Sequence, residues 1–417
     1  MGDTAHKVFE RRLRSRRRKE TRFKFYGVMA IVLAISVLVM ILGSIFLKGV
    51  SAFYREEIEL TFQFTERAEG QDDTSYFKAL VDAALDQEIV VSDEVQKHKR
   101  HQLVSIGTYR MLKEIVQSEK DITGQTRKLW VPAASEVDQL RKGEIKREVP
   151  ESDRKITDRQ IKWVDILKER GKLDRKFKLS FLTHGDSREP ELAGIYGALK
   201  GSLFTLLVTF LLSFPIGVIT AIYLEEFAKK NRWTDLIEVN INNLAAVPSI
   251  IFGLLSLAIF LNFFHLPRSA SLVGGLTLML MILPMIIIAS RTALRSVPRS
   301  IRDAARGIGA SEVQVVFHHA LPLAMPGILT GTIIGMARAL GESAPLLMIG
   351  MVAFIVDPPG DISDPSTVLP VQIYQWALRP ERGFVENTSG AIMILLLFLF
   401  IMNVGAIYLR RKFEKRW

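Results

Sequence analysis

Two residues of opposite charge stand four positions apart inside a hydrophobic stretch of this 417-residue chain. The segment GMARALGESAPLLMIG (335–350) carries Arg338 and Glu342 between apolar flanks. Ionisable side chains are costly in such surroundings unless they are paired or hydrated. A planar guanidinium can bind an oxyanion through two parallel hydrogen bonds. We therefore expect an anion pathway in which Glu342 pairs with Arg338 until the anion arrives; the alternative is a permanent structural ion pair.

A helical wheel places these two charges beside a stripe of glycines. At about 100° per residue, Gly327, Gly331 and Gly335 fall within one narrow sector. Arg338 and Glu342 fall in the same sector. Small residues four positions apart mark the face on which transmembrane helices approach closely. The wheel therefore predicts that both charges face the bundle interior or a pore, with Arg338 near the membrane midplane.

Other polar residues are candidates for supporting roles. Ser343 could donate a hydrogen bond to the anion. Arg291 ends the expected fourth span, where it is either an anchor at the cytoplasmic face or an anion contact on the exit side. Glu225 and Glu226 lie at the inner boundary of the second span and are expected to pair with the lysines at 229–230.

The charged pair needs a membrane-spanning scaffold, and the composition supplies one. The chain is 48% hydrophobic with a mean hydropathy of +0.20, yet 24% of its residues are charged. Both figures fit only if the apolar residues are gathered in blocks. Apolar blocks of about 20 residues, long enough to cross a bilayer as helices, occur at 26–48, 198–224, 244–264, 272–290, 326–350 and 390–409. We predict an all-α polytopic membrane protein with six transmembrane helices and an amphipathic interfacial segment at 232–243.

The placement of charge predicts which segments lie inside the cell. The net charge is +11, but residues 51–190 are nearly neutral, with 26 basic and 27 acidic side chains. Short basic flanks stay cytoplasmic, which places the N-terminus (1–25) and the tail (410–417) inside and residues 49–195 outside. This pattern indicates contact with a lipid bilayer and argues against nucleic-acid binding. The first apolar block is too long for a cleaved signal peptide and is expected to remain as an anchor.

The external region of residues 49–195 is large enough to be a domain of its own. IELTFQFTE (58–66) alternates like a strand, whereas YFKALVDAALDQ (76–87) has the apolar spacing of a helix. We predict a small α+β insert. His98 and His101 are expected to form a solvated pair, and no metal site is expected. The absence of cysteine excludes disulfides, cysteine-ligated zinc and thiol nucleophiles.

The cytoplasmic segment after the fourth span has the pattern of a docking knob. In RDAARGIGASEVQVVFHHALPLAMPGI (302–328), a short helix is expected to begin at Asp303, since a helix dipole favours an acidic residue near its N-terminus. Gly307 and Gly309 then interrupt the helix. A second helical segment is expected to follow and to be interrupted at Pro322 and Pro326, before the next span begins. The residues that carry the pattern are Asp303, Ala304, Ala305, Gly309, Leu321 and Pro322.

This loop resembles the coupling loop of the permease subunits of ABC importers. Their pattern is Glu-Ala-Ala, three residues, Gly, nine residues, Ile, one residue, Leu-Pro. The present chain has the same spacing and departs from the pattern at Asp303, which replaces Glu, and at His319, which replaces Ile. The resemblance implies a type I ABC permease core over 196–409, with its cytoplasmic coupling loop at 299–325.

Further segments narrow the resemblance to the phosphate permeases of the PstA type. They are EPELAGI (189–195), YLEEFA (223–228), NNLAAVPSIIFG (242–253) and GMARALGESAPLL (335–347). The resemblance implies transport of inorganic phosphate across the bacterial inner membrane, and a part in it for Arg338 and Glu342. It also implies three partners, namely an ATP-binding homodimer, a second permease of the PstC type and a periplasmic phosphate-binding protein. The sequence lacks GxxxxGK[ST], so ATP is expected to be used by the partner and no cofactor by this chain.

Alternatives from the same and other classes stay open. The cargo could be another oxyanion, such as sulfate or molybdate. A membrane sensor acting through the external region would require a cytoplasmic signalling domain, whereas only short basic ends flank the spans. A membrane enzyme would require clustered catalytic side chains within the spans, and the sequence offers none. We expect a non-catalytic translocation subunit.

Overall fold

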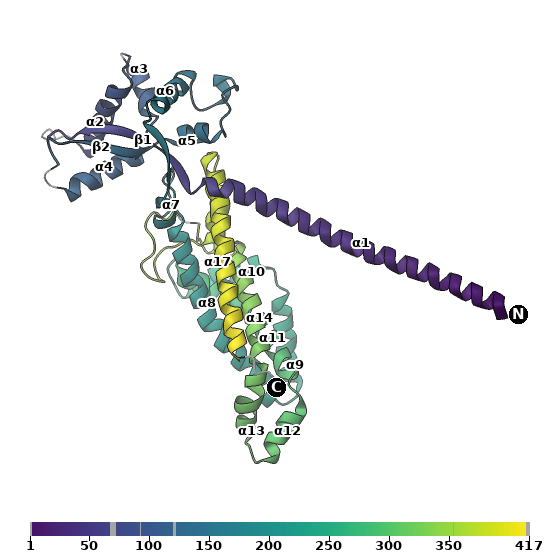
Figure 1. The fold of residues 1–417 in the computed structure, drawn as a ribbon. Helices are drawn as coiled ribbons and strands as arrows, with labels where there is room; N and C mark the ends of the chain where they lie inside the picture. The colour runs from purple at the N-terminus through teal and green to yellow at the C-terminus, as the bar shows by residue number, and fades with distance from the viewer. Residues whose placement is uncertain (1, 67–71, 92, 120–121, 353, 414–417) are drawn as a thin grey trace.

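A computed structural model of the chain describes residues 2–66, 72–91, 93–119, 122–352 and 354–413. Figure 1 shows a helical bundle, a mixed domain at one end of it, and a long N-terminal helix that projects from their junction. The α-helices outside the mixed domain are α1 (Gly2–Ser51), α8 (Tyr196–Ile222), α9 (Arg232–Ala245), α10 (Ser249–Ser256), α11 (Ser271–Arg295), α12 (Arg299–Gly307), α13 (Glu312–Gln314), α14 (Leu321–Gly341), α15 (Ala344–Met348), α16 (Leu369–Ala377) and α17 (Gly383–Phe413). Three π-helical turns extend them, η2 (Tyr223–Phe227), η3 (Leu257–Phe263) and η4 (Val315–Ala320).

The part of the chain that the structure describes contains five helices long and apolar enough to cross a membrane, or six if one bent pair counts as a span. The five are Lys19–Ser51, Tyr196–Phe227, Ser271–Arg295, Glu312–Gly341 and Gly383–Lys412. The bent pair is Arg232–Ala245 with Ser249–Phe263, which meet at 104°. The predicted class, a polytopic helical membrane protein, is therefore confirmed. Two of the six predicted spans have other bounds in the structure.

The predicted third span at 244–264 is wrong at its start. Helix α9 ends at Ala245, three residues before Pro248, and a proline disfavours the helical conformation at the residue that precedes it. Pro248 has an extended backbone with φ −56° and ψ 138°. As a result, the segment at 232–243, predicted as interfacial, is most of α9, which forms one arm of the bent pair.

The predicted fifth span at 326–350 is wrong at both ends. The helix ends at Gly341, and α15 follows as a separate short helix. At its other end the helix is continuous from Glu312, so Pro322 and Pro326 do not reset the chain. The wider π-helical turn η4 immediately precedes Pro322, and such turns absorb a local mismatch in helical hydrogen bonding.

The N-terminal helix α1 contains the predicted first span and lies apart from the bundle over most of its length (Figure 1). Its apolar residues between 28 and 42 are exposed on this single chain. Only its last turns reach the bundle, where an added Cβ on Gly49 would lie 2.9 Å from the carbonyl oxygen of Ser389 in α17. Glycine at this position allows close approach of the two backbones.

The external domain is a three-stranded antiparallel sheet packed with short helices, which confirms the α+β prediction. The strand order is β2-β1-β3, with Ile58 of the central strand opposite Val131 and Leu173. The strands are β1 (Tyr54–Gln63), β2 (Thr126–Pro132) and β3 (Leu173–Phe177). The helices are α2 (Asp73–Glu88), α3 (Glu94–His101), α4 (Gly107–Ser118), α5 (Ser135–Lys142), α6 (Asp158–Glu169) and α7 (Ser180–Thr183), with a 3-10 turn, η1 (Glu151–Asp153).

The prediction of a solvated histidine pair in this domain is wrong for His101. Its Nδ1 lies 2.6 Å from the Oδ1 of Asp82, and its Nε2 contacts the hydroxyl of Tyr109. Burial against a carboxylate gives the ring a fixed orientation between α2 and α4. Within the described ranges no group of three or more His, Cys, Asp or Glu side chains is arranged to hold a metal ion.

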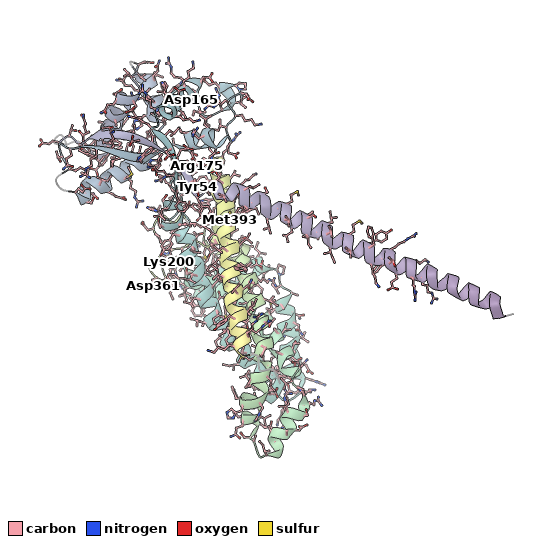
Figure 2. The ribbon with its side chains drawn as sticks, viewed as in Figure 1. Tyr54, Asp165, Arg175, Lys200, Asp361 and Met393 are labelled. Carbon is pink, nitrogen blue, oxygen red and sulfur yellow. The ribbon has the colours of Figure 1, made fainter. Side chains whose placement is uncertain are left out.

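The external domain is joined to the outer end of α17 through buried charges. The Nζ of Lys142 lies 2.6 Å from Asp138 and 2.8 Å from Glu386 of α17. At the neck between the domain and the bundle, the guanidinium of Arg175 lies 5.0 Å from the centre of the Tyr54 ring (Figure 2). Among these contacts, the ion pair between Lys142 and Glu386 connects the domain to the bundle, and breaking a buried pair of this kind is unfavourable.

Candidate functional site

The glycine stripe of α14 lies against α11. An added Cβ on Gly327 would be 2.7 Å from the Cβ of Ala293, and one on Gly331 would overlap the Cβ of Ala289. Gly335 is less crowded, with its nearest neighbour, Ile286, at 3.8 Å. The two helices therefore pack with almost no space between their backbones, and α11 also packs against α8 to complete the centre of the bundle.

Arg338 lies one turn beyond Gly335, where the contact between α14 and α11 is already looser, and its predicted position facing a pore stays a prediction. Its side chain is 49% exposed on the single chain. Glu342 lies beyond the end of α14, with an extended backbone at φ −80° and ψ 129°, and its side chain is 20% exposed. The wheel does not apply to Glu342, because α14 ends at Gly341. The guanidinium therefore lies on the surface of this subunit and not inside its bundle.

Arg338 and Glu342 nevertheless face each other. The Nε of Arg338 lies 3.6 Å from the Oε1 of Glu342, which is an ion pair but longer than a hydrogen bond. Ser343 follows directly and is the residue that precedes α15. The polypeptide turn between the two helices thus carries an acceptor and a hydroxyl beside an exposed guanidinium.

Two hydroxyl residues near Glu342 were missed in the sequence. Ser202 and Thr205 of α8 line a cavity of about 10 Å³ together with Glu342, which is space for about one water molecule. The hydroxyl of Ser202 accepts a hydrogen bond of 2.8 Å from the backbone N–H of Leu369, whereas that of Thr205 is buried without a partner. Their spacing of three residues on an apolar helix was the available signal.

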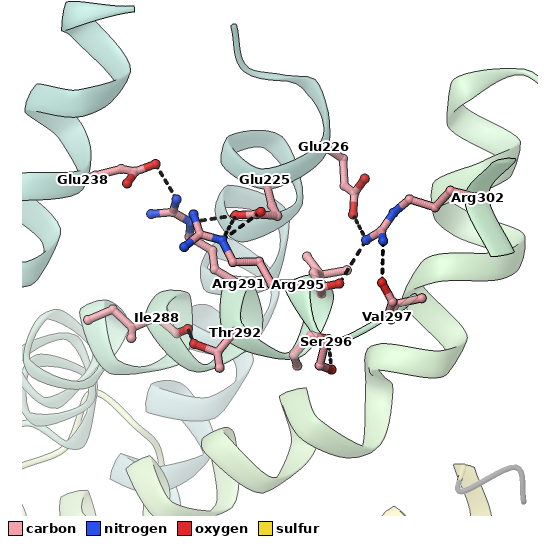
Figure 3. A network of polar contacts seen from close by, with 12 residues as sticks. Glu225, Glu226, Glu238, Ile288, Arg291, Thr292, Arg295, Ser296, Val297 and Arg302 are labelled. Atoms are coloured by element: carbon pink, nitrogen blue, oxygen red, sulfur yellow. Dashed lines mark hydrogen bonds and ion pairs between the residues drawn. The ribbon is translucent and has the colours of Figure 1, made fainter. Parts of the chain in front are cut away.

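Arg291 lies in a separate network at the other end of α11 (Figure 3). Its Nε is 3.4 Å from Glu225, and another of its nitrogens contacts Glu238 of α9. Glu225 also accepts from Arg295 at 2.8 Å. The expected pairing of the glutamates at 225 and 226 with the lysines at 229–230 is wrong, because arginines from α11 and α12 approach these carboxylates after folding.

The structure does not bring Arg291 together with Arg338. Gly327 lies beside Ala293 and Gly335 near Ile286, so α11 and α14 run antiparallel. Arg291 is therefore level with the part of α14 between Gly327 and Gly331, two turns or more from Arg338. At 1.5 Å per residue, that separation is roughly 10 Å or more along the axis.

The docking knob is built from α12, a glycine bend and α13. Gly309 has a φ of +89°, a conformation that favours glycine. Ser311 then caps α13 by accepting from the backbone N–H of Gln314. Arg306 closes the bend, 3.1 Å from Asp303 and 2.9 Å from Glu312.

Asp303 lies in the middle of α12 and not at its start, because the helix begins at Arg299. Ala304 is exposed and Ala305 is buried. Leu321 and Pro322 open α14 in continuation of the second arm of the knob. The tip of the knob carries exposed apolar side chains, among which Ile308 is 82% exposed.

The sequence similarity to known proteins falls on the bundle. Residues 213–417 match the family of binding-protein-dependent transport system inner membrane components. The phosphate transport system permease protein PstA 1 of Mycobacterium tuberculosis (strain ATCC 25618 / H37Rv) is 30% identical over 220 residues, which are 52% of this chain and 70% of that protein. This chain belongs to the PstA family of permease proteins. The PstA protein of Haemophilus influenzae is 28% identical over 226 residues, 54% of this chain and 79% of that protein.

The N-terminal part of this PstA-family chain has a match of its own. Residues 10–151 match a domain of unknown function, DUF3333, which takes in α1 and most of the external domain. Among solved structures, one of the MetNI methionine ABC transporter in an inward-facing conformation is similar to this chain. The aligned region takes in 53% of this chain and 95% of the MetNI chain, with 18% sequence identity and a TM-score of 0.41.

Proposed function

We propose that this chain is the transmembrane permease subunit of an ATP-driven importer that moves inorganic phosphate across the bacterial inner membrane. The similarity to PstA permeases over the bundle carries the proposal. The chain is a non-catalytic translocation subunit. The surface arginine beside Glu342 supports an anionic cargo, because a guanidinium presents parallel donors to an oxyanion.

The pathway runs past Arg338, Glu342 and Ser343 at the boundary between two permease subunits. An exposed guanidinium on a membrane helix requires a hydrated or protein environment. A second permease of the PstC type supplies it by covering this face. Phosphate displaces the carboxylate of Glu342, and the carboxylate returns when phosphate leaves, so that binding is tight enough for entry and weak enough for release. Arg291 serves as a structural residue, since two carboxylates neutralise it.

The knob formed by α12 and α13 docks on an ATP-binding homodimer. Its support is the exposed apolar tip with Ile308, Val313 and Phe317, which lies at the end of the bundle opposite the external domain (Figure 1). ATP is bound and hydrolysed by that partner, and no cofactor is held by this chain. A periplasmic phosphate-binding protein delivers the cargo on the side of the external domain. Both termini are cytoplasmic.

Reconstitution tests this function. The chain would be purified with its ATP-binding, second permease and binding-protein partners, and incorporated into proteoliposomes loaded with ATP. We expect uptake of radiolabelled phosphate that depends on the binding protein. Uptake of sulfate or molybdate without phosphate uptake would assign the other oxyanion cargo instead, and the absence of any ATP-dependent uptake would reject the transport function.

A further inference from the structure

A guanidinium on the docking knob is buried against two spans at the cytoplasmic end of the bundle. Arg302 of α12 donates a hydrogen bond of 2.6 Å to Glu226. It also donates to the carbonyl oxygens of Val297 at 2.7 Å and Leu294 at 2.9 Å (Figure 3). The side chains of the ion pair are 12% and 10% exposed.

The partners of Arg302 explain why this position needs an arginine. Leu294 lies in the last turn of α11, and Val297 lies two residues beyond the end of that helix, where backbone carbonyls lack the partners of a continuing helix. A cation at a helix C-terminus is also favoured by the helix dipole. Glu226 lies in η2, at the end of α8. The planar guanidinium therefore donates hydrogen bonds to the ends of two spans at once, to α8 through Glu226 and to α11 through the two carbonyl oxygens.

One face of α12 packs against the bundle, and the opposite face is exposed. Ala305 is buried on the same side as Arg302. On the opposite side Asp303, Ala304 and Gly307 are exposed and available to a docking partner. A force applied to the outer face thus reaches the bundle through the inner face, where Arg302 makes its three hydrogen bonds.

The neighbouring ion pairs extend this junction to the rest of the inner bundle. Glu225, adjacent to Glu226, accepts from both Arg291 and Arg295 of α11. Arg291 in turn contacts Glu238 of α9. Two consecutive carboxylates of η2, at the end of α8, therefore contact arginines of α11 and α12, and Arg291 links α9 to the same network.

We propose that Arg302 is a positioning residue that makes α12 and the inner ends of α8 and α11 move as one rigid unit. A displacement of the knob by the ATP-binding partner is then transmitted to the spans without a hinge at 296–298. The inference rests on the proposed function, in which the knob docks on that partner. A knob that pivoted independently would leave a buried guanidinium and carboxylate without partners, which is strongly unfavourable.

The first test uses the complete reconstituted complex and measures phosphate taken up per ATP hydrolysed. We expect Glu226→Ala to lower this ratio by about fivefold or more, the lower range for a typical coupling between two sites, while ATP hydrolysis and subunit assembly persist. Arg295→Ala is the matched control, because its side chain is exposed and Glu225 keeps Arg291. We expect that control to keep the wild-type ratio.

A covalent tether supplies the second test. The chain has no cysteine, so Glu226→Cys with Arg302→Cys, in a complex with cysteine-free partners, allows specific cross-linking with a short bifunctional thiol reagent. We expect the reduced double variant to be uncoupled and the cross-linked form to regain phosphate uptake. A wild-type ratio in Glu226→Ala, or a cross-linked form that stays uncoupled, would overturn the proposal. Failure of the wild-type complex to take up phosphate would reject the proposed function instead.

Discussion

Arg338 and Glu342 face each other across the end of α14, with 3.6 Å between Nε and Oε1. Arg338 lies in the last turn of the helix, and Glu342 lies in the extended segment just beyond it. Because they do not share one continuous helix, the carboxylate can move away by rotation of the backbone at 342 without unwinding α14. We therefore propose that the pair opens when an oxyanion competes for the guanidinium.

Replacing Arg338 should stop transport without disturbing assembly. Arg338→Gln removes the charge while keeping a polar side chain of similar length. Hydrogen bonds to charged groups contribute about 1.5–3 kcal/mol, so we expect phosphate uptake to fall by at least about tenfold. Uptake into proteoliposomes and size-exclusion chromatography of the complex measure the two properties. Normal uptake by the variant would mean that Arg338 is only a structural partner of Glu342.

Gly309 should matter for coupling through its backbone conformation. Gly309→Ala places a side chain at a φ of +89°, which costs about 1–2 kcal/mol for an L-residue, although no atom lies within 4 Å of the added Cβ. We expect ATP hydrolysis to continue while phosphate uptake falls. Gly307→Ala is the control, because its Cβ also meets open space and its backbone is helical. Equal coupling in both variants would count against a docking role for the bend.

Gly331 should be required for the packing of α14 on α11. A Cβ at this position would overlap the Cβ of Ala289. We expect Gly331→Ala to destabilise the purified protein by about 1–3 kcal/mol, the usual cost of overpacking, and to lower its thermal unfolding temperature. Gly341→Ala, at a position with nothing within 4 Å, should leave the temperature unchanged. A similar shift in both variants would show that replacing glycine changes the stability of helix α14 itself and not its contact with α11.

The junction of the external domain should weaken as pH rises toward neutrality. Burial raises the pKa of Glu191 to about 7, although Ser105 donates a hydrogen bond of 2.6 Å to its carboxylate. Between about pH 4.5 and 7 the folded chain keeps a proton that the unfolded chain releases, so the free energy of unfolding falls across this window by at most about 3 kcal/mol.

Glu191→Gln isolates this contribution. The variant cannot titrate at 191, so its thermal stability should change less between about pH 5 and about pH 7 than that of the wild type. Burial also lowers the pKa of Lys178 to about 7, but that group acts in the separate window above pH 7, where it makes stability rise. An identical slope in both proteins below pH 7 would contradict the assignment to Glu191.

Features that depend on residues close in sequence were accessible before the structure. Apolar block length indicated the spans, and alternation at 58–66 indicated the central strand. The spacing of Gly327 and Gly331 points to a close helix contact, and these residues do lie against α11. The failures occurred where a local rule was extended too far. The wheel placed Glu342 on α14 although the helix ends at Gly341, and Pro322 was expected to interrupt a helix that is continuous from Glu312 to Gly341.

By itself the sequence determined the class of molecule, the family and the residue types available for anion binding, because these follow from composition and short-range spacing. Only the tertiary structure decided which charges meet. Glu226 and Arg302 are 76 residues apart, and nearer lysines seemed better partners until the packing of α8, α11 and α12 buried the guanidinium beside the carboxylate. Partner choice among charges depends on which groups lose water together, and that is set by the packing of the helices.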